Sequence, residues 1–182
     1  LLDNYELCIY GKDDGMKNDY IKLAKSLNVT INFYNSTNKV NKLLNEFEIL
    51  CIPSTLEGFP VILCEALSSN TKIIASDIIG IKECYDFAEE NQYNKLFCLF
   101  KSKNIKELSE KIIGILENKI ILNNEKGNEF IENYYSINSH MINLNNIISY
   151  LYKETNNNSK LNLINYKNIT SNINDLKKYF KI

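Results

Sequence analysis

The sequence predicts an α/β protein with a doubly wound, Rossmann-like parallel sheet and additional helices at its C-terminal end. Short apolar runs of strand type alternate with segments whose apolar residues recur at helical spacing, which is typical of βαβ units. Strands are expected near 5–10, 29–34, 48–52, 72–75 and 96–100. Parallel strands need crossover connections, and the intervening helical segments can supply them.

Helical periodicity predicts the elements between and after these strands. Helices are expected over 16–27, over 40–47 and from Val61 to Leu67, where the chain is apolar on every side. Later apolar stripes begin near Ile105, Phe130 and Ile137, so the C-terminal third is expected to be helical. His140 lies beside the last stripe and is interpreted as a helix-surface residue. The chain from Thr155 onward is polar and predicts a loose linker, with a short helix near 176–180.

Composition excludes several classes of function. The chain has 182 residues, 45% hydrophobic and 24% charged, with a formal net charge of −1, so nothing indicates a nucleic-acid partner. All 21 basic residues are lysines, and arginine's bidentate grip on phosphate is therefore absent. Five cysteines without metal-type spacing favour a reducing, cytoplasmic location. No apolar run approaches the roughly 20 residues of a membrane-spanning helix.

One stretch, Pro53 to Glu65, carries the chemistry. It joins an apolar strand to a buried helix through a tight turn that holds both prolines of the chain. A helix N-terminus placed in this way directs unpaired N–H groups and a partial positive charge at an anion. Glu57 lies on the turn and Glu65 two helical turns further on. Their carboxylates can accept hydrogen bonds from hydroxyls on two parts of one ligand, with an anionic group between those parts.

These residues resemble a known signature. Glu57 and Glu65 enclose seven residues, Pro-Ser precedes them, Gly-Phe-Pro follows Glu57, and Glu-Ala-Leu begins at Glu65. With the Ala75-Ser-Asp and Gly80-x-x-Glu83 segments that follow, the stretch is similar to the E-x7-E motif of the retaining, group 1 glycosyltransferases of GT-B fold. The resemblance implies that 1–153 is a nucleotide-sugar-binding, Rossmann-like domain and that 154–182 is an appended linker.

The resemblance also implies a role for each motif residue. Glu57 would lie near the donor sugar and stabilise the oxocarbenium charge, as the catalytic residue, and Glu65 would hydrogen-bond the donor ribose. The remaining donor-binding residues would be Ser54, Gly58, Phe59, Pro60, Val61 and Ile62, the last two through backbone N–H groups on the diphosphate. No metal or other cofactor is implied. The reaction would be sugar transfer, with retention, from a nucleotide-diphosphate sugar to an acceptor hydroxyl in cell-surface polysaccharide synthesis.

The resembled family also has parts that precede this stretch. Its donor domain opens with a strand and a helix before the segment matched by 5–11, and an acceptor domain comes earlier still. We therefore expect a fragment of a longer enzyme, inactive alone, whose glycan or lipid-linked acceptor would bind the missing half, with peripheral membrane association as a further expectation. Lys12 is poorly placed to replace the basic pair that normally neutralises the diphosphate.

The residues leave several alternatives open. The chain could hold a sugar nucleotide without transferring the sugar, or belong to another enzyme of GT-B fold such as a sugar-nucleotide epimerase. The motif could also be a plain surface turn, and Glu65 a buried acid satisfied by a local partner. Ser54 or Thr55 could serve the turn alone, and Glu83 could brace the loop before Gly80. Ile79 is expected in a loop where the family often has glycine. Asn70 stands where the family usually has glycine, a mild change because asparagine tolerates a left-handed backbone.

Overall fold

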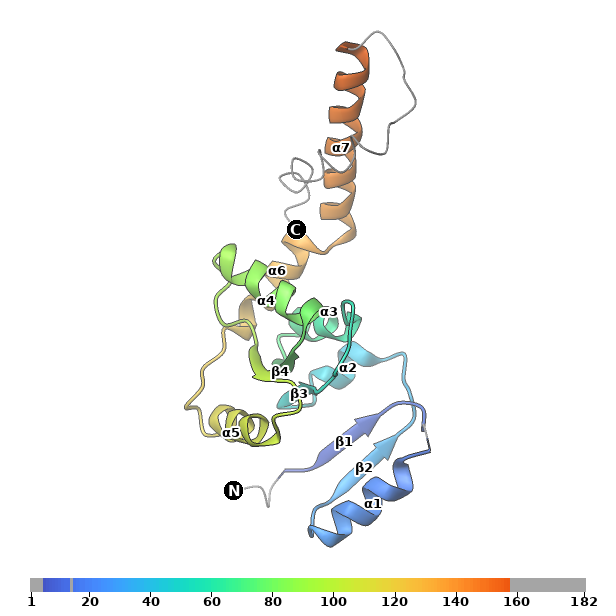
Figure 1. Ribbon diagram of the computed structural model, residues 1–182, viewed down its shortest axis with the longest axis vertical. Helices are drawn as coiled ribbons and strands as arrows, with labels where there is room; N and C mark the ends of the chain where they lie inside the picture. Colours follow the sequence, from blue (N-terminus) through green and yellow to red (C-terminus); the bar gives the residue numbers. More distant parts are fainter. Residues whose placement is uncertain (1–4, 14, 158–182) are drawn as a thin grey trace. The chain divides into compact units, whose positions relative to one another are not determined.

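The computed structural model describes residues 5–13 and 15–157. The chain forms two compact units, Leu1–Leu43 and Leu44–Ile182, which Figure 1 labels element by element. Each unit has its own parallel sheet, with two strands in the first and three in the second.

The first unit is a single βαβ arrangement. Its strands β1 (Leu7–Tyr10) and β2 (Ile31–Tyr34) pair in parallel, with Leu7 opposite Ile31. Helix α1 (Lys17–Ser26) provides the crossover, and the short α2 (Val40–Leu44) follows at the boundary with the second unit. The rings of Tyr10 and Tyr34 stack with their centroids 4.6 Å apart at the carboxyl ends of the two strands.

The second unit contains the larger sheet. Its strands β3 (Ile49–Ile52), β4 (Lys72–Asp77) and β5 (Cys98–Lys101) pair in parallel in the order β3-β4-β5. Residues Ile73 to Ser76 of the central β4 are fully buried, because helices contact this strand and a neighbour pairs along each edge. The helices are α3 (Val61–Ser68), α4 (Ile79–Glu90), α5 (Ile105–Leu116), the 3₁₀ turn η1 (Asn124–Lys126), α6 (Gly127–Tyr134) and α7 (Ile137–Asn157).

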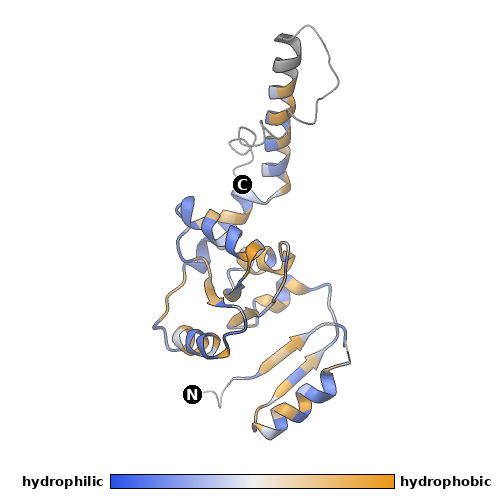
Figure 2. Ribbon diagram, in the orientation of Figure 1, coloured by the Kyte–Doolittle hydropathy of each residue, from blue (hydrophilic) through white to orange (hydrophobic). Residues whose placement is uncertain are grey.

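One hydrophobic cluster of this unit lies between the sheet and α5. Ile74 of β4, Phe100 of β5 and Ile115 of α5 form its centre, all less than 5% exposed. Asn104 caps α5 by accepting a hydrogen bond from the N–H of Glu107. Figure 2 shows hydrophobic residues concentrated on the strands and on α3.

Helix α3 ends in a motif that the sequence encodes locally. The N–H of Thr71 donates to the carbonyl of Ala66 and that of Asn70 to the carbonyl of Leu67, which is the Schellman pattern. Asn70 takes the left-handed backbone conformation that this motif requires, with φ at 54°. The expectation that Asn70 tolerates this conformation is confirmed.

Gly127 lets helix α6 pack closely against α3. A Cβ on Gly127 would lie 2.4 Å from the carbonyl oxygen of Leu67, so the first turn of α6 packs directly on the α3 backbone. Only glycine permits this approach without moving one of the two helices. The α3–α6 contact therefore depends on the absence of one side chain.

The predicted strands are confirmed, as are their parallel pairing within each of the two sheets and the position of the Glu57 turn after the third strand. Helix α4 was not predicted. The expectation that Ile79 lies in a loop needing glycine is wrong, because Ile79 is the first residue of α4 and has no positive φ. Helix α7 continues to Asn157, past the Thr155 at which the linker was expected to begin.

Other expectations remain untested by the structure. The proposed short helix near 176–180 and the rest of 158–182 lie outside the described residues. Because the two sheets belong to separate units, the single domain expected over 1–153 stays a prediction.

The Gly127 contact leads to a stability prediction. Gly127→Ala should lower the free energy of unfolding by about 1–3 kcal/mol, because the added methyl group would displace α3 or α6. Gly58→Ala is the matched control, since its Cβ would meet no atom within 4 Å. Urea unfolding of both variants measures the difference. Equal stability of the two variants would contradict the role given to Gly127.

Candidate donor-sugar site

The turn that follows β3 is held by a bond between its own side chains. The hydroxyl of Ser54 donates to Oε1 of Glu57 over 3.0 Å, and both residues are partly buried. This bond orients the Glu57 carboxylate while leaving its other oxygen available. Ser54 therefore braces Glu57, a role that the sequence left open between donor contact and turn structure. Thr55 is exposed and does not take part.

The N-terminus of α3 opens directly after this turn. Pro60 caps the helix with an extended backbone and no side-chain hydrogen bond, and Leu63 N–H donates to the Pro60 carbonyl over 3.0 Å. Within the described part of the chain, the backbone N–H groups of Val61 and Ile62 have no acceptor. Val61 is 70% exposed. Unpaired N–H groups at an exposed helix N-terminus form an anion-binding position.

Gly80 determines where the turn can lie. A Cβ on Gly80 would fall 1.5 Å from the carbonyl oxygen of Gly58 and 3.1 Å from that of Glu57. The turn therefore rests on the backbone of the first turn of α4. Gly58 itself is open, with no atom within 4 Å of the place of a Cβ, so its outer side is accessible to a ligand. The sequence pattern identified both glycines but not their contact.

Phe59 provides a second anchor for the turn. Its ring stacks on Tyr135, with the centroids 5.3 Å apart and the planes 10° from parallel. Tyr135 in turn hydrogen-bonds to Cys84 of α4, and burial raises the pKa of Cys84 to about 12. Burial, reinforced by the neighbouring Cys84, also raises the pKa of Tyr135 well above its usual value. Tyr135 was not expected from sequence, and its place directly after α6 provided no signal of this contact.

Glu65 has no local partner that would explain it. It is half-buried on α3 and, among the residues described, its carboxylate accepts no hydrogen bond and forms no ion pair. The reading of Glu65 as an acid satisfied by a neighbour therefore finds no support in the described chain. Burial, followed by the Glu65 charge, raises the pKa of the adjacent Cys64 to about 11.

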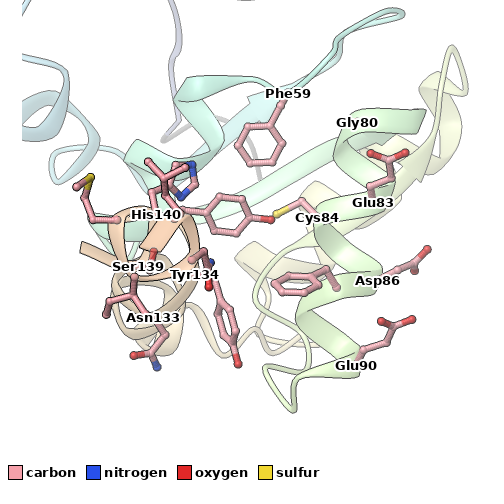
Figure 3. Close-up of a pocket in the computed structure, with 16 residues that line it drawn as sticks. Phe59, Gly80, Glu83, Cys84, Asp86, Glu90, Asn133, Tyr134, Ser139 and His140 are labelled. Atoms are coloured by element: carbon pink, nitrogen blue, oxygen red, sulfur yellow. The ribbon is translucent and has the colours of Figure 1, made fainter. Parts of the chain in front are cut away.

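A cavity lined by described residues lies beside the motif. It has a volume of about 1070 Å³ and is bounded by α4, α6 and the start of α7. Figure 3 shows Phe59 at one end, Glu83, Asp86 and Glu90 along α4, and Tyr134 and His140 on the other wall. We call this cavity the α4–α7 groove. Of the expected site residues it contains only Phe59, so a shared cleft for Glu57 and Glu65 stays a prediction.

Glu83 lies on α4 and not in the loop before Gly80. Glu83 is exposed at the edge of the α4–α7 groove, and no side chain caps α4, so Glu83 does not cap the loop before Gly80.

Residues 5–13 and 15–157 contain no cluster of three or more histidine, cysteine or carboxylate side chains able to hold a metal ion. In the same residues no helix is both long and apolar enough to cross a membrane.

A known protein family matches most of the chain. The family model described as glycosyl transferases group 1 matches residues 1–136, three quarters of the chain. The chain belongs to this family. The expected signature residues, Glu57 to Glu83, all lie inside the matched range.

Two curated relatives match parts of the chain. A Campylobacter jejuni protein named N,N'-diacetylbacillosaminyl-diphospho-undecaprenol alpha-1,3-N-acetylgalactosaminyltransferase is 37% identical over 89 residues, 49% of this chain and 22% of its own length. An uncharacterized glycosyltransferase of Haemophilus influenzae is 28% identical over 110 residues, 59% of this chain and 28% of its own. The chain thus spans about a quarter of the curated relatives it matches.

Solved structures agree with the family. TarM is 26% identical with a TM-score of 0.63, over 79% of this chain and 29% of its own. A variant of S. aureus TarM, solved with fondaparinux, alpha-GlcNAc-glycerol and UDP, has a TM-score of 0.62 at 26% identity, over 75% of this chain and 28% of its own. HepE of Anabaena, solved with UDP, is 16% identical with a TM-score of 0.58, over 72% and 36%, and shows the fold alone. These likenesses confirm the Rossmann-like α/β fold of GT-B type.

The buried thiol beside Tyr135 predicts a pH dependence. Because the pKa of Cys84 is raised from 9.0 to about 12 on folding, its contribution is intact below about pH 9 and is lost as the pH rises toward 12. Over that range one such group lowers the free energy of unfolding by about 1.4 kcal/mol per pH unit. Urea unfolding at pH 8 and 10.5 should show this loss, and Cys84→Ala should show a shallower one. An identical slope in both proteins would contradict the burial of this thiol.

Proposed function

We propose that this chain is the donor-binding half of a retaining glycosyltransferase. In that enzyme a sugar passes from a nucleotide-diphosphate donor to an acceptor hydroxyl during assembly of a cell-surface polysaccharide. The observation that carries the proposal is the N-terminus of α3, where the unpaired N–H groups of Val61 and Ile62 follow directly on the turn that holds Glu57.

The geometry supports an anionic donor. The helix N-terminus carries a partial positive charge of about half a unit, which stabilises a diphosphate both before and during its departure. Burial of Leu63, Ala66 and Leu67 keeps α3 from moving when the charge on the ligand changes. Donors that do not have to reorganise during the reaction are the ones that stabilise a transition state.

The relatives support the substrate class. The name of the Campylobacter jejuni relative describes transfer of N-acetylgalactosamine to a sugar on a diphospho-undecaprenol carrier. TarM and HepE were both solved with UDP. We therefore propose that this chain uses a nucleotide-sugar donor and a glycan or lipid-linked acceptor, and that the transferred group is a hexosyl group. We also propose a cytoplasmic site of action with peripheral attachment to a membrane.

Each glutamate has a distinct proposed task. Glu57, held by Ser54, would face the sugar and stabilise the positive charge that develops at its anomeric carbon. Glu65, which has no partner among the described residues, would accept hydrogen bonds from the ribose hydroxyls. Donor binding would need no metal, since backbone N–H groups take the place of a cation at the diphosphate.

The competing function is binding without transfer. It is favoured by the absence of arginine from the whole chain, because the diphosphate leaving group usually needs strong positive charge. A binding module and an enzyme respond differently to loss of Glu57. Only an enzyme has a turnover number that can fall while affinity for the donor is kept.

Two substitutions test the division of roles in the protein at its full length. Glu65→Gln should weaken donor affinity by about tenfold or more, because a hydrogen bond to a charged group is worth about 1.5–3 kcal/mol. Glu57→Gln should leave donor affinity nearly unchanged and lower turnover by about 100-fold, because the charge it stabilises exists only in the transition state. Calorimetric titration with the donor and a steady-state transfer assay measure the two effects.

The exposed Glu46→Gln is the matched control, since it removes one surface carboxylate away from the motif. Small and equal effects of all three substitutions on affinity and turnover would leave both motif glutamates as scaffold. A donor that binds normally with no transfer in the unmodified full-length protein would favour the binding module instead.

A further inference from the structure

The α4–α7 groove combines an apolar interior with an acidic border. Its interior is aromatic, formed by Phe59, Phe87, Tyr134 and Tyr135. Its α7 wall adds Met141 and Leu144, which are 51% and 48% exposed. Exposed apolar side chains that line a concave surface mark a place where another group docks. The groove lies apart from Glu65 and from the N-terminus of α3, neither of which lines it.

The border of the groove is negatively charged. Glu83, Asp86 and Glu90 lie on one side of α4, at helical spacing, and Figure 3 shows them in succession along that helix. Lys82 pairs with Asp86, whereas Glu83 and Glu90 form no ion pair with any residue that the structure describes. Among the residues that the structure describes, no lysine lines the groove. An occupant should therefore carry apolar side chains and positive charge together.

One segment of the chain has this composition. Residues 175–182 read Asp-Leu-Lys-Lys-Tyr-Phe-Lys-Ile, with four apolar or aromatic residues and three lysines against one acid. The lysines are Lys177, Lys178 and Lys181. The net positive charge of this segment complements a border on which Glu83 and Glu90 form no ion pair with a described residue, while its aromatic residues match the aromatic interior.

The chain is long enough to bring the two together. Helix α7 ends at Asn157, about 20 Å along its axis from Leu144 at the groove. Residues 158–174 can span up to roughly 55 Å when extended. Tethering also raises the effective concentration of the segment near the groove to the millimolar range, so a weak affinity suffices for occupancy.

We propose that the segment 175–182 docks in the α4–α7 groove of its own chain, with its aromatic residues on Phe59 and Tyr135 and its lysines on Glu83 and Glu90. Docking covers the stack that anchors Phe59, and so it stabilises the turn that carries Glu57. The proposed contact joins two parts of the same chain, and it does not depend on which sugar the protein transfers.

Carbodiimide cross-linking of the full chain at low concentration tests this proposal, because it joins a lysine to a carboxylate only when the two are in contact. Mass spectrometry should find links from Lys177, Lys178 or Lys181 to Glu83 or Glu90, severalfold above links to the exposed Glu46 and Glu125. Raising the salt concentration to 1 M should reduce them, because the Debye length falls to about 3 Å.

Charge reversal provides the matched control. The triple variant Lys177→Glu, Lys178→Glu, Lys181→Glu should lower the unfolding midpoint of the chain, and adding Glu83→Lys and Glu90→Lys should recover it. The pair Glu46→Lys and Glu125→Lys should not. Links no more frequent at the groove than at the control acids, or no recovery on double reversal, would overturn the proposal. Links that form between isotopically labelled and unlabelled copies would overturn it in favour of a second copy as occupant.

Discussion

The position of the candidate site depends on a contact that a single side chain would prevent. A Cβ on Gly80 would lie 1.5 Å from the carbonyl oxygen of Gly58. The turn and the first turn of α4 can therefore pack this closely only because residue 80 has no side chain. This contact fixes where the Glu57 turn lies on α4, and the hydrogen bond from Ser54 then orients the Glu57 carboxylate. Any larger residue at position 80 would have to move either the turn or the helix.

A similar contact supports the helix that follows. Gly127 lets α6 rest on the backbone at the end of α3, while burial of Leu63, Ala66 and Leu67 fixes its inner face. The open end of α3 is then its N-terminus, where Val61 is exposed. A rigid helix with one accessible positive end is suited to binding an anion without rearrangement. The stack of Phe59 on Tyr135 completes the support from the α6 side.

Local sequence signals predicted much of this arrangement. Short apolar runs predicted the five strands of the described residues, including β1, which is mostly exposed. Asn70 was expected to tolerate the left-handed conformation that it adopts. Helix α4 was missed because Ile79 and Gly80 at its start are poor helix signals, and its apolar residues are interrupted by Lys82, Glu83 and Asp86.

Long-range contacts could not be predicted from the sequence. Gly58 and Gly80 were both recognised within a motif, but their contact depends on how two loops meet at the edge of the sheet. Tyr135 lies 76 positions after Phe59, and no periodicity connects the two. The motif residues proposed to bind the donor can therefore be found from the sequence, whereas the long-range contacts that hold them in position cannot.

The Gly80 contact holds the Glu57 turn in place, and with it the proposed donor site. The most direct test of this role is UDP affinity, measured by calorimetric titration on full-length protein carrying Gly80→Ala or Gly127→Ala, well below the unfolding midpoint of both. Both substitutions introduce a backbone clash in this unit, but only the first touches the Glu57 turn. We expect Gly80→Ala to weaken UDP binding by about tenfold or more, equivalent to about 1.4 kcal/mol, and Gly127→Ala to weaken it less. Unchanged UDP affinity in a folded Gly80→Ala protein would contradict the account.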